Sequence, residues 1–329
     1  MAPMTSPEAR IVPLLEDTRA SVVMVAPHPD DETLASGGLL QRAHASGAAV
    51  SVLLLTDGDN NPWPQRWQQR RWTIDSVART EWGRRRRGEA VDALSRIGLG
   101  EGTLQALAWP DMGLTSRIGE RLDESVMTLR EHFRLHRPTL VVAPILEDRH
   151  PDHSAARVLV ELALAHGVGP MPELWGFAMH GGVAHAQGLV LSVAEREGKA
   201  RALESHGSQL VLGGNRWRRR ISGDENYVVG PAAHVHPSAW DSLTLPWRPW
   251  APGLGDCEIL IAACTGSWRL PWREGARCGP MHLRLSPEPT IEIERDFTEH
   301  ELFVKLYSRR RNVWIFDHWG WRRIARSRA

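Results

Sequence analysis

Cysteine, lysine and long apolar runs are all scarce in this sequence. The three cysteines, Cys257, Cys264 and Cys278, are odd in number and lack C-x-x-C spacing, which argues against a disulfide framework and against a cysteine zinc site. Only two of the 40 basic residues are lysines, and the formal net charge is +1. No global field therefore directs the chain to nucleic acid or to a membrane.

The apolar runs also exclude a membrane-embedded protein. The longest of them, such as Val52–Leu55 and Leu140–Ala143, are far shorter than the roughly 20 residues that a spanning helix requires. The first twenty residues carry acidic side chains and lack an apolar stretch flanked by positive charge, so no signal peptide is expected. We expect a soluble, cytoplasmic protein whose apolar content, 42%, permits a sizeable core.

Short apolar runs alternate with helical patterns through the first two-thirds of the chain. Ser21–Ala26 is a valine-rich run typical of a buried strand, and Glu32–Ser46 has apolar residues on one helical face. The pattern continues with strands expected at 49–56, 104–108, 139–143 and 174–179, and helices at 85–97, 122–135 and 154–165. This repetition predicts an α/β fold with a Rossmann-like, mostly parallel sheet and helices on both faces.

The segment Asp57–Trp82 interrupts this alternation. It is long for a connection and carries Trp63, Trp67 and Trp72 among arginines and glutamines. Long connections in compact domains are usually functional lids or mobile segments. The other interpretation is that the tryptophans bury this loop against the body of the protein.

The composition changes after Tyr227. Residues 231–286 are rich in Pro, Gly and Trp, and residues 288–317 alternate like antiparallel strands, for example Thr290–Arg295 and Val313–Phe316. We therefore divide the chain into a domain at 1–229 and a β-rich C-terminal extension at 230–329. The tryptophans of the extension are expected to pack within it, ahead of forming a wall of the site or an oligomer interface. They are Trp240, Trp247, Trp250, Trp268 and Trp272.

A cluster of charged side chains follows the first predicted strand directly. One imidazole and three carboxylates, His28, Asp30, Asp31 and Glu32, lie within five residues. Such a cluster is costly unless a cation compensates its negative charge. His28 and Asp31 can face one ion across a strand-to-helix turn, which leaves Asp30 free as a base. The alternative for this cluster alone is a solvated, charged helix start.

A second cluster, Glu147–His153, follows the predicted strand at 139–143. Because parallel strands end at the same edge of a sheet, His153 and His28 are expected to meet there. Two imidazoles and one carboxylate with a fourth position open to water form the ligand set of a catalytic zinc site. Two histidines favour zinc over magnesium, which argues against a magnesium phosphohydrolase.

These motifs resemble the PIG-L (LmbE-like) family of zinc-dependent N-acetylglucosaminyl deacetylases. The segment Val25–Thr33 (VAPHPDDET) and the later His150–His153 (HPDH) carry the resemblance, which extends over residues 19–228. Further segments similar to the family are Gly37–Gly38, Leu55–Gly58, Arg86–Ala90, Trp109–Leu114 and Ala202–Gln209. The last hundred residues lie outside the resemblance.

The resemblance implies a catalytic role for each motif residue. His28, Asp31 and His153 would hold the Zn²⁺. Asp30 would be the general base that deprotonates the attacking water. His150 would stabilise the developing oxyanion or protonate the leaving amine, with zinc and a protonated His150 facing the oxygen that gains charge.

Three further positions match the family with other implied roles. Asp152 would orient one of the histidines, and Arg86 and Asp111 would contact sugar hydroxyls. For Arg86 the alternative is a helix-surface arginine in the run Arg84–Arg87. The implied reaction is removal of an N-acetyl or other N-acyl group from an amino sugar or sugar conjugate, with no nucleic-acid partner and no membrane span.

Other functions remain open at this point. Within the family, the main rival is an amidase acting on a thiol conjugate. A nucleic-acid-binding protein would use the short basic runs at Arg84–Arg87, Arg216–Arg220 and Arg309–Arg311, which match no known module. A dinucleotide-dependent oxidoreductase is disfavoured because no G-x-G-x-x-G follows the first strand.

Overall fold

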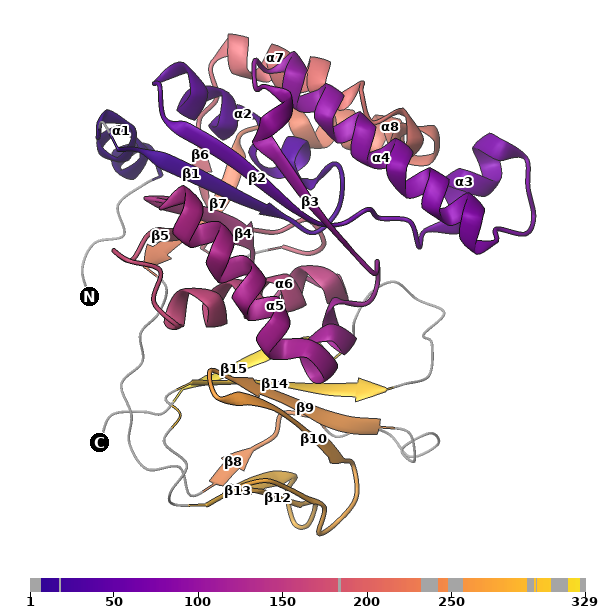
Figure 1. Cartoon of the computed structure of the whole chain (residues 1–329), viewed down its shortest axis with the longest axis vertical. Helices are drawn as coiled ribbons and strands as arrows, with labels where there is room; N and C mark the ends of the chain where they lie inside the picture. The colour runs from indigo at the N-terminus through magenta and orange to yellow at the C-terminus, as the bar shows by residue number, and fades with distance from the viewer. Residues whose placement is uncertain are drawn as a thin grey trace.

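A seven-stranded sheet organises the first two-thirds of the protein in the computed structural model (Figure 1). The structure describes residues 7–17, 19–182, 185–231, 242–247, 257–294, 299, 301–308 and 319–325. The strand order is β3-β2-β1-β4-β5-β7-β6. The strands from β3 to β5 pair in parallel, and β7 pairs antiparallel with both β5 and β6. The strands are β1 (Ser21–Ala26), β2 (Ala49–Thr56), β3 (Leu104–Trp109), β4 (Leu140–Pro144), β5 (Glu173–Phe177), β6 (Gln187–Leu189) and β7 (Glu225–Pro231).

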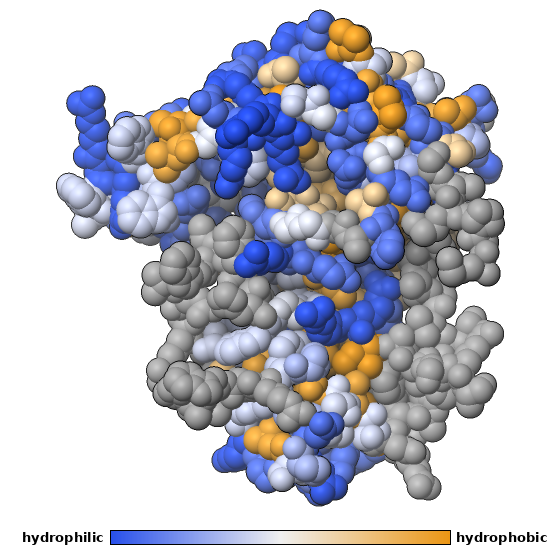
Figure 2. All heavy atoms as spheres, turned by 180° about the vertical axis from the view of Figure 1, so that it is seen from behind, coloured by the Kyte–Doolittle hydropathy of each residue, from blue (hydrophilic) through white to orange (hydrophobic). Residues whose placement is uncertain are grey.

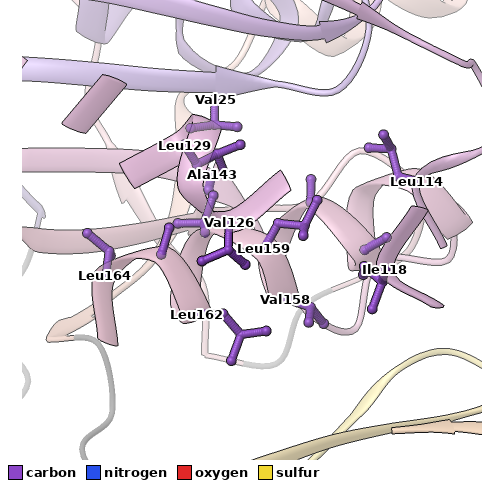
Figure 3. Packing of buried hydrophobic residues seen from close by; sticks show 14 of the residues in the cluster. Val25, Leu114, Ile118, Val126, Leu129, Ala143, Val158, Leu159, Leu162 and Leu164 are labelled. Atoms are coloured by element: carbon purple, nitrogen blue, oxygen red, sulfur yellow. The ribbon is translucent and has the colours of Figure 1, made fainter. Parts of the chain in front are cut away.

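Helices cover both faces of this sheet, which confirms the predicted α/β fold. They are α1 (Pro7–Glu16), α2 (Asp31–Ala45), α3 (Pro62–Gln69), α4 (Ser76–Arg96), the 3-10 helix Glu101–Thr103, α5 (Leu114–His136), α6 (Pro151–Ala165), α7 (Val193–Leu203) and α8 (Gly207–Ile221). Alternate residues of the apolar run in β1 enter different cores. Val22 and Met24 pack with α2 and α7, whereas Val23 and Val25 pack with α5 and α6. Figure 3 shows Val25 in the second of these cores, near Leu129 of α5.

A β-sandwich follows on the outer side of α5 and α6 (Figure 1). Its two four-stranded sheets have the orders β10-β9-β14-β15 and β11-β12-β13-β8. The strands are β8 (Ser242–Thr244), β9 (Cys257–Ala263), β10 (Gly266–Pro271), β11 (Arg277–Cys278), β12 (Met281–Arg284), β13 (Thr290–Ile293), β14 (Glu301–Ser308) and β15 (Arg322–Ala325). The β-rich character predicted for the C-terminal part is thereby confirmed.

The layer of α5 and α6 is buried on both sides. Ile118 and Leu122 share one apolar core with Leu260 and Phe303 of the sandwich, as well as with the central sheet. Polar contacts add to this packing: the Ser116 hydroxyl lies 2.9 Å from the Tyr307 hydroxyl. The sandwich therefore supports the two helices that begin at the carboxyl edge of the sheet, α5 after β3 and α6 after β4.

Three of the tryptophans expected to pack within the extension do so. Trp247 is buried in the core between the two sheets, and Trp268 and Trp272 pack against that core. Packing was the expected role. Trp240, Trp250 and the strand expected at Val313–Phe316 lie outside the described residues.

The prediction of a long loop at Asp57–Trp82 is wrong. The segment contains α3 and the first turns of α4, each started by a side-chain cap: Asn61 accepts from the Trp63 N–H and Asp75 from the Ala78 N–H. Pro62 in the first turn of α3 is a further start signal. The tryptophans do not bury this segment either, since Trp63, Trp67 and Trp72 are 61%, 68% and 87% exposed.

Two other helices begin earlier than predicted. Helix α4 begins at Ser76 instead of Arg85, and α5 begins at Leu114 instead of Leu122. Helix α5 is kinked at Arg121, whose φ of −145° is not helical, so the predicted helix corresponds to the part after the kink. None of the described helices combines the length and apolarity that crossing a bilayer requires.

Candidate metal centre

The two charged clusters meet at the carboxyl edge of the central sheet. Strands β1 and β4 are parallel neighbours, with Val22 beside Leu140 and Met24 beside Val142. Each strand ends directly before a cluster, and each cluster opens a helix, α2 after β1 and α6 after β4. This topology brings His28 and His153 together, with 3.2 Å between His28 Nδ1 and His153 Nε2.

Three potential ligand atoms converge at this point. Asp31 Oδ2 lies 3.4 Å from His28 Nδ1 and 3.3 Å from His153 Nε2, and the two nitrogens are 3.2 Å apart. Donors bound at zinc distances in a tetrahedron are separated by roughly 3.3–3.6 Å. The triangle of His28, Asp31 and His153 therefore has the spacing that a tetrahedral cation requires, and it consists of donors that zinc prefers.

The second nitrogen of each imidazole faces carboxylates, with a hydrogen bond for His153 and none for His28 Nε2 among the described residues. His28 Nε2 lies 3.2 Å from Asp111 Oδ1 and 3.5 Å from Asp152 Oδ2, and His153 Nδ1 lies 3.2 Å from Asp148 Oδ2. Metal-binding histidines usually donate their remaining N–H to such an acceptor, which fixes the ring and its tautomer. The nitrogens that face each other and Asp31, His28 Nδ1 and His153 Nε2, are thus left free to act as ligands.

Donor atoms around His28 form two alternative groups as well. The sets His28, His150 and His153, and His28, Asp111 and Asp152, each place three donors close enough for one cation. We favour the triangle with Asp31 because its three atoms are 3.2–3.4 Å apart and because carboxylates already occupy the opposite side of His28.

Asp148 is a functional residue that the sequence reasoning left without a role. Its carboxylate accepts from the backbone N–H groups of His150 and Met179 at 2.9 and 2.7 Å, in addition to its contact with His153. Asp152, expected to orient a histidine, lies near His28 and accepts from the N–H groups of Met112 and Leu114. Asp148 is therefore the carboxylate that positions His153.

Replacing Asp148 with asparagine is expected to weaken metal binding by about 10–100-fold, because an amide is a weaker acceptor for the His153 N–H. Competition titration of the purified protein with a zinc chelator measures this change. Asp123→Asn, at an exposed carboxylate of α5, is the control and should leave the affinity unchanged. Equal affinity of Asp148→Asn and the native protein would contradict the assigned role.

The electrostatics of the cluster favour an added cation. Burial alone would lower the pKa of His28, but the carboxylates of Asp111, Asp152 and Asp31 raise it well above the ordinary value. Burial opposes the charge of His153 as well, yet Asp31 and Asp148 raise its pKa to about 9. The excess negative charge that draws protons onto these rings would also attract a divalent metal.

Asp30 lies beside this triangle in a strained and tightly held conformation. Its φ is 126°, a value that non-glycine residues rarely adopt, and the Glu32 carboxylate accepts its backbone N–H at 2.9 Å. Burial raises the pKa of Asp30 to about 6, against the lowering effect of Arg86. Backbone strain that the surroundings enforce is typical of residues whose side chain must point in one direction.

Arg86 is part of the site. The interpretation of Arg86 as a helix-surface arginine is wrong, since the residue is 4% exposed. Its guanidinium donates to the carbonyls of Gly58 and Pro29 and lies 3.4 Å from Asp30 Oδ2. Gly58 has a φ of +61°, and a Cβ there would lie 1.7 Å from Arg86 Nη1, which explains the glycine in the Leu55–Gly58 segment.

Asp111 joins the other side of the site to α3. Its Oδ1 faces His28, and its Oδ2 accepts from the Asn60 N–H at 2.7 Å. The Asn60 side chain donates back to the Asp111 carbonyl at 3.2 Å. Both residues expected to contact substrate thus lie against the charged cluster: Arg86 is close to Asp30, and Asp111 is close to His28.

A backbone hydrogen bond defines the tautomer of His150. Its Nδ1 accepts from the Asp152 N–H at 3.2 Å, which caps α6 and places the ring proton on Nε2. Burial and the neighbouring His28 and His153 hold its pKa well below the ordinary value. A resting protonated His150 is therefore disfavoured, and the residue is suited to donate a hydrogen bond from Nε2.

A family model described as PIG-L, GlcNAc-PI de-N-acetylase, matches residues 23–164, which include every residue of the cluster. Residues 23–164 are thus similar to the PIG-L family. A 1D-myo-inositol 2-acetamido-2-deoxy-alpha-D-glucopyranoside deacetylase from Mycobacteroides abscessus is 31% identical over 160 residues, covering 45% of this chain and 56% of that protein. The chain therefore aligns with little more than half the length of this relative.

Two further proteins are similar to this chain. The deacetylase of the same name from Corynebacterium diphtheriae is 28% identical over 230 residues, covering 58% of this chain and 76% of that protein. The N,N'-diacetylchitobiose deacetylase from Pyrococcus horikoshii covers 70% of this chain and 96% of its own, with a TM-score of 0.50 and 18% identity. At 18% identity, this similarity shows a shared fold.

Proposed function

We propose that this protein is a zinc-dependent hydrolase that removes the N-acetyl group from an N-acetylglucosamine conjugate. The observation that carries the proposal is the triangle of His28 Nδ1, Asp31 Oδ2 and His153 Nε2, with edges of 3.2–3.4 Å. The PIG-L match and the relatives named as deacetylases of a glucosaminyl inositol support the choice of substrate class.

The side chains around the triangle divide the chemistry among them. A zinc ion held there would supply a Lewis acid and lower the pKa of a water molecule. The Asp30 carboxylate lies beside Arg86, and the Glu32 carboxylate holds the Asp30 backbone N–H; this carboxylate of Asp30 accepts the proton of the attacking water. The His150 Nε2–H donates to the amide oxygen as negative charge develops on it.

Arg86 and Asp111 are proposed to orient the sugar. Arg86 Nε is buried, and within the described part of the chain it has no hydrogen-bond partner. A buried donor left unpaired costs free energy that a ligand oxygen could recover. Asp111, already fixed by Asn60, offers a carboxylate to a neighbouring sugar hydroxyl.

A panel of N-acetylated substrates tests this proposal. We expect acetate release from glucosaminyl inositol and other N-acetylglucosamine conjugates, loss of release on treatment with a strong chelator, and recovery on adding zinc. N-acetylated amino acids and N-acyl thiol conjugates without a sugar serve as controls. Release confined to the thiol conjugates would favour the amidase alternative and contradict the proposed sugar specificity.

A nucleic-acid-binding function receives no comparable support. Several arginines of the runs singled out for it are engaged within the protein: Arg85 with Glu89, Arg87 with Asp57, and Arg218 with Glu204. The run Arg309–Arg311 lies outside the described residues.

A further inference from the structure

Helix α3 and the turn after it project from the body of the protein (Figure 1). Trp63, Trp67 and Trp72 are 61%, 68% and 87% exposed, and Val77, at the start of α4, is 65% exposed. Seen from behind in Figure 2, this end of the molecule projects at the left edge and shows hydrophobic and hydrophilic residues side by side. Large aromatic side chains usually lie buried or at interfaces, so this concentration is typical of a docking surface.

The same surface is cationic. Between Asp59 and Asp75 the sequence has three arginines, Arg66, Arg70 and Arg71, and no acidic residue. Arg66 lies over the Trp63 ring, 5.2 Å from its centroid. Across the described residues, no carboxylate lies within 4.0 Å of Arg70 or Arg71. Their charge is thus available to an external anion.

This surface is joined directly to the candidate active site. Asn60, which contacts Asp111, is followed by Asn61, whose side chain caps α3. Since consecutive Cα atoms are about 3.8 Å apart, Trp63 lies within roughly 11 Å of Asn60 along the chain. Whatever engages α3 is therefore held close to Asp111.

We propose that α3 and the following turn, residues 62–72, dock on the surface of an anionic phospholipid membrane. Indole rings partition to the headgroup level of a bilayer, where the apolar ring contacts lipid and the N–H can form a hydrogen bond. Neighbouring arginines are attracted to anionic lipids. The convex shape of the projection suits a planar surface better than single-stranded nucleic acid, which binds in grooves. On the basis of the proposed function, docking would present lipid-linked amino sugars to the site.

Sedimentation of the full-length protein with vesicles tests the docking. We expect binding to vesicles of phosphatidylcholine mixed with phosphatidylglycerol, little binding to phosphatidylcholine alone, and weaker binding at high salt. Arg70→Gln combined with Arg71→Gln should weaken binding to the anionic vesicles by about 5-fold or more for each arginine. Trp67→Ala combined with Trp72→Ala should weaken it further, because insertion of the rings is lost.

The controls come from the last turn of α5. Leu135 is 75% exposed and Arg134 is exposed beside it, so Leu135→Ala combined with Arg134→Gln matches both kinds of change on another surface. This control variant should retain binding to the anionic vesicles. All variants, in α3 and in α5, should keep the native melting temperature because the replaced side chains are exposed.

Three results would overturn the docking proposal. The first is no binding to anionic vesicles, and the second is an equal loss of vesicle binding in the α5 control. The third is that Trp67 and Trp72 mediate self-association or binding to single-stranded DNA, and not binding to vesicles. Acetate release from a soluble conjugate should be unchanged in the α3 variants. That readout separates failure of the docking proposal from failure of the proposed reaction.

Discussion

Asp30→Asn is expected to lower kcat for acetate release by about 100–10,000-fold while zinc remains bound. The substitution keeps the size of the side chain and removes its ability to accept a proton. It leaves the three donor atoms of the triangle in place, because Asp30 contacts Arg86 and Glu32.

Zinc content and acetate release, measured on the same preparation, check this prediction. Retained zinc with activity near the native value would exclude Asp30 as the base. Loss of zinc would mean that Asp30 helps to form the metal site, contrary to the roles proposed above. Glu81→Gln, at an exposed position of α4, provides a control in which a carboxylate is replaced away from the site.

His150→Asn is expected to lower kcat by about 100–1,000-fold, the typical effect of removing one oxyanion donor. Asparagine is a favoured helix cap, so it should preserve the acceptor that His150 Nδ1 provides to the Asp152 N–H. The Nε2–H donor is lost. KM should change far less than kcat, because the interaction strengthens only as charge develops on the amide oxygen.

His150→Ala separates the two roles of this residue. Alanine removes both the cap of α6 and the donor, and His153 lies in the first turn of that helix. We therefore expect reduced stability and weaker zinc binding in His150→Ala, with both properties near native in His150→Asn. Similar kcat for His150→Asn and the native protein would contradict a role for Nε2 in catalysis.

The sequence was informative where the chemistry depends on contiguous residues. The apolar run before His28 and the run before the Glu147–His153 cluster predicted two buried parallel strands, and the structure has β1 and β4 as neighbours there. Because parallel strands end at one edge of the sheet, assigning these two strands was enough to predict that the two clusters lie together.

The sequence was less informative where a role depends on contacts distant along the chain. Arg86 belongs to an arginine-rich stretch of α4, and its buried contact with the Pro29 and Gly58 carbonyls depends on how α4 crosses the ends of β1 and β2. Asp148 precedes His153 by five residues, but its contacts with Met179 and His153 appear only in the folded loop.

The segment with α3 shows a different limit. Its high content of Arg, Gln and Trp hides the helical apolar pattern, so the start signals at Asn61, Pro62 and Asp75 were needed to locate the two helices. Exposure of the tryptophans contradicts the general tendency of such residues to be buried. It is this departure from the usual pattern that indicates a docking surface.

The most direct test of the account is the zinc content of the full-length protein purified without chelator, compared with His153→Ala. The exposed His44→Ala on α2 controls for adventitious binding by surface histidines. The account predicts one zinc per chain in the native protein and in His44→Ala, and none in His153→Ala. Absence of zinc in the native protein, or zinc retained in His153→Ala, would contradict a metal centre formed by His28, Asp31 and His153.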